Sequence, residues 1–203
     1  MIQIFLKGGP IMWPLLFTSI VALAVVLERL FFVVRERMRR DADVVERVFA
    51  AVENGEREKA ILAGQASRDY VAKVLTYALT QRDHSHANSL LRAAGRELKR
   101  FNRGLSILDT VITLAPLLGL LGTVTGMIRS FSLLGGAELG APAAITGGIA
   151  EALIATAFGL LIAIIAIIPF NFLNTKMEDA RHEIEDAASR LDALLRPAAA
   201  IQK

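Results

Sequence analysis

The chain has 203 residues, of which 54% are apolar, and it carries 23 lysine and arginine residues against 20 acidic ones. The apolar residues occur in long blocks, which argues against an ordinary soluble domain of this length. The absence of cysteine excludes disulfides, thiolate metal sites and cysteine nucleophiles. Because acidic residues are interleaved with the basic ones, the net charge of +3 gives no reason to expect nucleic acid as a partner.

Three blocks are long and apolar enough to cross a bilayer as helices. Residues 11–27, 110–128 and 152–173 contain no charged residue. A bilayer core about 30 Å thick needs about 20 residues of helix, so we predict an all-α membrane protein with three transmembrane helices. The first block follows a single basic residue, Lys7, and no small-residue cleavage site comes after it. These features favour a retained span over a signal peptide.

Basic residues set the predicted orientation. Fifteen of the 23 lysines and arginines lie between Arg35 and Arg103, and five more follow Leu173. Because such residues favour the cytoplasmic side, we expect the N-terminus outside and the C-terminus inside, with the spans extended into the cytoplasm as long helices. The predicted segments are a periplasmic N-terminal segment (1–10), a first span (11–34), a cytoplasmic helical region (35–104), a second span (105–131), a periplasmic loop (132–141), a third span (142–173) and a cytoplasmic C-terminal helix (174–203).

The predicted cytoplasmic region shows helical periodicity in three stretches. Apolar residues recur with helical spacing in 44–52, and Asn54–Gly55 then predicts a turn. A second helix is predicted to carry the apolar residues of 70–79. The pattern breaks near 81–86, restarts over 90–101, and leads into the second span without a proline or a glycine-rich loop.

The segment after the third block keeps a helical pattern. Met177, Ile184 and Leu191 recur every seven residues, with alanine and leucine between them. This pattern predicts that the third span continues as an amphipathic helix and ends at Pro197.

The second block carries small residues at helical spacing. Gly119, Gly122 and Gly126 allow close approach of a second helix, and the last two have the GxxxG spacing. For the glycines alone, simple helix packing is the favoured interpretation. A polar or irregular stripe also recurs every seven residues and should face protein or water, because lipid would penalise it. Its members are Asp109, Pro116, Thr123 and Ser130.

The third block contains one carboxylate, Glu151. If the helix begins near Pro142, Glu151 lies nine residues in, or about 14 Å deep. An intramembrane carboxylate suggests a functional site, and the alternative is an interfacial carboxylate just outside the hydrocarbon. Gly148, Ala152 and Thr156 form a ridge of small residues suited to tight packing or a narrow pore. We find no second polar group at the depth of Glu151 and predict no catalytic, metal or cofactor site.

These two segments resemble the ExbB/TolQ branch of the ExbB/TolQ/MotA proton-channel family. The resemblance rests on Pro-x-x-Gly-x-x-Gly-Thr-Val-x-Gly within 115–131 and Gly-Ile-x-Glu-Ala-Leu-x-x-Thr within 148–159, with Asn171 further on. The predicted layout also matches, with three spans and a cytoplasmic region between the first two. MotA-type stators are less similar because they carry a fourth span.

The resemblance implies a subunit of an ion-driven motor in the bacterial inner membrane. Five copies would surround two single-span ExbD- or TolR-like helices, and proton flow would drive work across the periplasm, with a TonB- or TolA-like protein as a further partner. By position, Thr123 and Thr156 would line the central pore, and Glu151 would lie at the pore or at a subunit boundary. Asp109 departs from the family pattern.

Two other functions are weighed against the motor subunit. One is a membrane scaffold of the same fold that conducts no ions, and the other is an enzyme with an intramembrane acid. Glu151 together with Thr123 and Thr156 favours the motor over the scaffold. The sequence does not distinguish a Ton-type from a Tol-type system, or protons from sodium.

Overall fold

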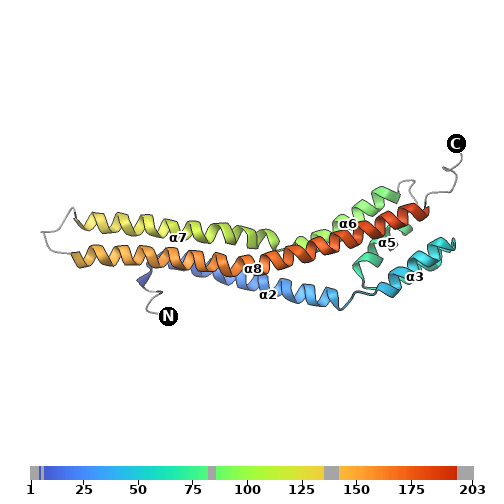
Figure 1. Ribbon diagram of the computed structural model, residues 1–203, viewed down its shortest axis with the longest axis horizontal. Coiled ribbons are helices and arrows are strands. Elements are labelled where there is room, and N and C mark those ends of the chain that lie inside the picture. Colours follow the sequence, from blue (N-terminus) through green and yellow to red (C-terminus); the bar gives the residue numbers. More distant parts are fainter. Residues whose placement is uncertain (1–4, 6, 82–85, 135–141, 196–203) are drawn as a thin grey trace. The chain divides into compact units, whose positions relative to one another are not determined.

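The computed structural model describes residue 5 and residues 7–81, 86–134 and 142–195. Throughout these ranges the regular secondary structure is helical, without a strand (Figure 1). The helices are α2 (Met12–Arg37), α3 (Ala42–Glu53), α4 (Arg57–Gln65), α5 (Tyr70–Thr80), α6 (His86–Asn102), α7 (Leu105–Leu134) and α8 (Pro142–Leu195). The chain forms two compact units: an apolar unit, residues 1–29 and 104–172, and a bundle unit, residues 30–103 and 173–203.

Three helices are long and apolar enough to cross a membrane, which confirms the number of spans predicted. They are Met12–Arg37, Leu105–Ser132 and Thr146–Leu195. At most 28% of the most apolar stretch of each helix is buried within the chain. Large side chains such as Phe17 and Ile168 therefore face outward, each 69% exposed. An apolar surface of this extent is favourable against lipid and unfavourable against water.

The apolar unit is held together by a small contact among all three of its helices. Met12 and Leu15 of α2 pack with Ala115 of α7 and Ala155 of α8, and all four are at most 1% exposed. Two of the four are alanines, so α7 and α8 approach each other with little side chain between them. Dispersion contacts between closely packed helices are a main source of association in lipid, where there is no water to expel.

The bundle unit begins with a capped helix and the predicted turn. The side chain of Asp41 accepts a hydrogen bond from the Val44 backbone N–H at 3.1 Å, which satisfies one of the free donors at the start of α3. The helix ends at Asn54, and Gly55 follows with a φ of +75°, a conformation that glycine adopts without steric cost. The turn predicted at Asn54–Gly55 is confirmed.

The core of the bundle unit explains the seven-residue repeat after the third block. Ile184 and Leu191 of α8 are at most 1% exposed and belong to one cluster with Val48 of α3 and with Leu75 and Leu79 of α5. The predicted amphipathic helix is confirmed as far as Leu195. The predicted end at Pro197 and part of the predicted break near 81–86 lie outside the described residues.

Two features of the bundle unit were not predicted. A separate helix, α4, lies between the turn and α5, and its short sequence buries only Ala60 and Gly64. The lead into the second span is also interrupted, because α6 ends at Asn102 and α7 begins at Leu105. Gly104, between them, has a φ of +84°. A single glycine in this conformation is a common way to end a helix.

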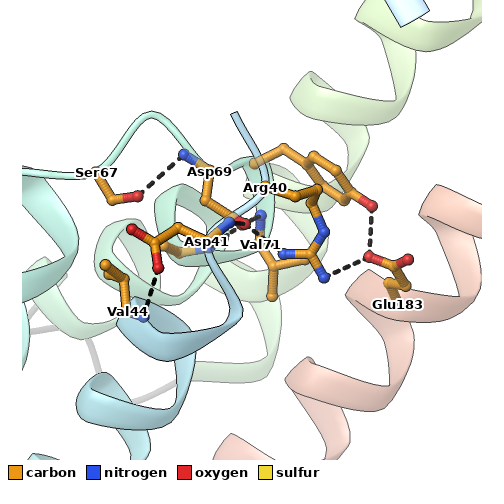
Figure 2. A network of polar contacts seen from close by, with 9 residues as sticks. Arg40, Asp41, Val44, Ser67, Asp69, Val71 and Glu183 are labelled. Atoms are coloured by element: carbon orange, nitrogen blue, oxygen red, sulfur yellow. Dashed lines mark hydrogen bonds and ion pairs between the residues drawn. The ribbon is translucent and has the colours of Figure 1, made fainter. Parts of the chain in front are cut away.

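A buried polar network organises one end of the bundle unit (Figure 2). Asp69 is fully buried; it caps α5 by accepting from the Val71 N–H at 2.7 Å, and it also accepts from the Arg40 guanidinium. Arg40 reaches Glu183 of α8 at 2.6 Å, and the Tyr70 hydroxyl donates to Glu183 at 2.5 Å. A buried carboxylate is tolerated when it is paired and hydrogen-bonded in this way. The network therefore joins the segment after α2 to α5 and α8.

The Tyr70 hydroxyl should resist deprotonation. Burial and the hydrogen bond to Glu183 raise the pKa of Tyr70 above its ordinary value of 10.0. Because the folded-state pKa exceeds the unfolded one, the stability from this hydroxyl is complete below about pH 10 and is lost as the pH rises above it. At about pH 11, folded wild type and Tyr70→Phe should show equal tyrosinate absorbance, and denaturation should add one more tyrosinate to the wild type than to Tyr70→Phe. A difference between the folded proteins at that pH would contradict the assignment.

Candidate functional site

The α7–α8 contact is made by residues with little or no side chain. A Cβ added at Gly119 would lie 3.0 Å from Cα of Thr156, and one at Gly126 would lie 2.9 Å from Cβ of Ala152. Contacts this short force a neighbouring atom to move. The other two glycines predicted to allow close helix packing lie on the same contact. Gly122 faces Ala155, and Gly148 faces Ser130.

One glycine of this contact was not singled out from the sequence. A Cβ at Gly159 would lie 2.5 Å from the carbonyl oxygen of Ala115 and 3.1 Å from Cα of Gly119. Gly159 lies 11 residues after Gly148, which is three helical turns, so both lie on the same face of α8. Extending the small-residue ridge of 148–156 by one turn would have identified it.

Thr156 joins the two helices by a hydrogen bond. Its Oγ1 donates to the carbonyl oxygen of Gly119 on α7 at 2.8 Å. This carbonyl is within reach because Gly119 has no side chain. Interhelical hydrogen bonds of this kind contribute about 0.6–2 kcal/mol in lipid. The Thr156 hydroxyl therefore has a defined partner between the helices.

Thr123 lies one turn further along α7 and has a different environment. Its Oγ1 donates to the carbonyl oxygen of Leu120 in its own helix at 2.6 Å, and the side chain is half-buried. Among the described residues, no hydrogen bond joins Thr123 to Thr156. Thr123 contributes to a shallow surface hollow of about 510 Å³ with apolar neighbours. These neighbours are Val124, Met127, Ile128 and Phe131.

Glu151 forms an ion pair between the two helices. Nη1 of Arg129 on α7 lies 3.2 Å from Oε1 of Glu151, and the exposed fractions of the two side chains are 61% and 22%. The chain preceding α2 covers the carboxylate, because a Cβ at Gly9 would overlap Oε1. Gly9 has a φ of +73°, so glycine is favoured there on backbone grounds as well. A carboxylate in an apolar unit is costly when unpaired, and Arg129 compensates its charge.

Reasoning from the sequence missed Arg129 as the partner of Glu151. Arg129 lies five residues before the end of α7 and Glu151 nine residues after the start of α8, or about 7.5 Å and 14 Å along the two helices. Only seven residues separate α7 from α8, so the two positions differ in height by about 6 Å, which a long arginine side chain can span. The expectation that no second polar group lies at the depth of Glu151 was therefore wrong. A guanidinium stays charged at all ordinary pH values, so it supplies no second acid or base.

The polar groups of the apolar unit lie at separate depths. Glu151 and Thr156 are five residues apart on α8, which is about 7.5 Å along the helix. On α7, Asp109 is exposed and precedes Thr123 by 14 residues, or about 21 Å. Within the described ranges, no group of three or more His, Asp or Glu side chains is placed to hold a metal ion. In the described part of α7 and α8, the arrangement offers hydroxyls and one paired carboxylate between the helices.

Comparisons with known proteins agree on one family. Residues 58–186 match the model of the MotA/TolQ/ExbB proton channel family. The chain is 38% identical over 198 residues to an ExbB-like biopolymer transport protein of Synechocystis sp., covering 95% of this chain and 78% of that protein. It is 36% identical over 98 residues to the biopolymer transport protein ExbB of Neisseria gonorrhoeae, covering 48% of this chain and 44% of that protein. It is 40% identical over 85 residues to the Tol-Pal system protein TolQ of Haemophilus influenzae, covering 42% of this chain and 37% of that protein.

Replacing Gly119 by alanine should loosen the site. The new methyl group would press on the Thr156 backbone, and overpacking of this kind costs about 1–3 kcal/mol. Gly147→Ala is the matched control, since its Cβ would meet nothing within 4 Å and alanine favours a helix by about 0.5–1 kcal/mol. Thermal unfolding followed by circular dichroism should give a lower Tm for Gly119→Ala and an unchanged or higher Tm for Gly147→Ala. Equal Tm values would show that the contact is looser than described.

Proposed function

This chain belongs to the MotA/TolQ/ExbB proton channel family, in its ExbB/TolQ branch, and on this premise we propose that it is a subunit of an inner-membrane motor driven by the proton-motive force. With an ExbD- or TolR-like single-span partner, it couples ion flow to energy transfer towards the outer membrane. A TonB- or TolA-like protein receives that energy. The membership supports a transport role and gives no support to an enzymatic one.

The observation that carries the proposal is the Arg129–Glu151 pair beside the tight α7–α8 contact. Near this pair, most of the other polar side chains of α7 and α8 carry hydroxyl groups. Charged side chains within a span are rare, and by default they indicate an ion pathway or a contact with a partner. The guanidinium that pairs with Glu151 is 61% exposed in the single chain, so a second protein or another copy of the chain can contact it.

The proposed topology has the N-terminus outside and the C-terminus in the cytoplasm. The distribution of basic residues supports it, since 20 of the 23 lysines and arginines lie in 35–103 or after Leu173. The bundle unit and the second part of α8 then lie on the cytoplasmic side, and Glu151 lies towards the periplasm. Protons entering from the periplasm would meet the Arg129–Glu151 pair before Thr156.

The proposed assembly is a ring of five copies around the partner helices. A closed ring shelters polar groups that lipid would penalise, which supports an inner face containing Thr123 and Thr156. Among the described spans, this chain offers one deep carboxylate and then about 21 Å of helix without a second acid between Thr123 and Asp109. The missing titratable group is proposed to be an aspartate on the ExbD- or TolR-like helix.

One observation favours the alternative, a scaffold without ion conduction. Arg129 is at ion-pair distance from Glu151, so the carboxylate already has a partner within the chain and the pair can serve as a structural link between α7 and α8. Conduction therefore requires that the pair opens or exchanges during the cycle. Variants that keep the shape of Glu151 and remove its charge distinguish the two functions.

Glu151→Gln should abolish motor function while the ring still assembles. We expect cells that depend on this chain to fall to the level of a deletion strain in an energy-transduction assay, because the amide takes up no proton. Thr123→Val and Thr156→Val should each impair function, and native mass spectrometry should still show five copies. Thr125→Val is the matched control for Thr156→Val, since the Thr125 hydroxyl bonds only carbonyls of its own helix whereas the Thr156 hydroxyl bonds Gly119 on α7. Normal function of Glu151→Gln would favour the scaffold.

A further inference from the structure

The end of α6 forms a basic hollow. Its volume is about 560 Å³, within the range of about 300–1,000 Å³ that small-molecule sites occupy. Four of the five residues that line it are basic, and the fifth is an amide. They are Arg96, Lys99, Arg100, Asn102 and Arg103. We define this set as the α6 hollow.

The charges of the α6 hollow are only partly compensated within the protein. Arg100 pairs with Glu97 and lies 3.7 Å from the buried Glu36. Arg96 stacks over the ring of Tyr77, a contact that leaves its charge in place. Among the described residues, no carboxylate lies within ion-pair distance of Arg96, Lys99 or Arg103. The hollow therefore holds three positive charges without an internal counter-ion.

Local helix physics does not account for this concentration of charge. Cations are favourable near the C-terminus of a helix, which explains Lys99 and Arg100 in the last turn of α6. Like charges three and four residues apart destabilise a helix, however, and Arg96 stands in that relation to both of them. An external anion that bridges the charges would remove the repulsion.

Covalent distance keeps Arg103, at one end of the α6 hollow, close to the start of the second span. Arg103 is two residues before Leu105, where the second span begins, and two residues reach at most about 7 Å. The headgroup layer beyond the hydrocarbon core is about 5–7 Å thick on each side. Arg103 therefore lies near the membrane surface that borders this end of the span, where a long basic side chain can reach lipid headgroups. This placement does not depend on the orientation of the chain.

We propose that the α6 hollow binds the anionic headgroup of a membrane phospholipid. Lys99 and Arg103 contact the phosphate, Arg96 closes the hollow, and Asn102 donates to a headgroup oxygen. The lipid supplies the counter-ion that the chain lacks and anchors the start of the second span in the leaflet. Lipid binding at the α6 hollow does not require ion conduction, so failure of the proposed function would leave this proposal intact.

The test is lipid binding to the intact protein in detergent micelles. Native mass spectrometry should show bound phosphatidylglycerol in preference to phosphatidylcholine. Lys99→Gln with Arg103→Gln should weaken phosphatidylglycerol binding by about 25-fold, at about fivefold for each charge. Arg47→Gln with Arg68→Gln is the matched control, because it removes two exposed arginines of the bundle unit that lie off α6 and changes the net charge equally.

Further variants and ligands separate the possible outcomes. Lys99→Arg with Arg103→Lys keeps both charges and should bind as the wild type does, which excludes a loss through misfolding. Equal binding of the two lipids, or equal losses in the Gln pair and its control, would overturn the proposal. Displacement of phosphatidylglycerol by an equal concentration of glycerol phosphate would overturn it too, since the hollow would then be a site for soluble anions.

Discussion

The close contact between α7 and α8 sets the position of every polar group that these two helices bring together. Because Gly119, Gly126 and Gly148 have no side chains, the backbones come near enough for Thr156 to donate to a carbonyl on the other helix. The same register brings Arg129 to Glu151. In lipid the helices gain nothing from expelling water, so this fit and these polar links must hold them together. A larger residue at Gly119 would disturb both the packing and the site.

The ion pair shows how the chain carries a charge into an apolar unit. Glu151 is paired to Arg129 and covered by the backbone at Gly9, so its carboxylate is neither free in lipid nor fully enclosed. The bundle unit also contains a carboxylate paired with an arginine, but this pair stabilises the fold. There the fully buried Asp69 pairs with Arg40 and accepts hydrogen bonds from several backbone N–H groups.

The sequence predicted the features that depend on the local residue pattern and on the length of the apolar stretches. The three spans follow from uninterrupted apolar stretches, and the buried face of α8 follows from the repeat of Ile184 and Leu191. Helix α4 escaped prediction because it buries little and its pattern is weak. The partners of Thr156 and Glu151 escaped because they depend on the register between two helices, which no single-helix pattern encodes. The sequence motif that identified the family specifies which residues are present. The structure shows which atoms those residues contact.

The central claim is that Glu151 lies on an ion pathway that this chain forms only together with a partner helix. Proton flux into liposomes, driven by a membrane potential and followed with an internal pH dye, measures it directly. Rings of the chain alone should be nearly proton-tight, addition of an ExbD-like subunit should open a flux, and Glu151→Gln should close it again. Strong flux through the chain alone, or flux with the partner that Glu151→Gln leaves intact, would contradict the account.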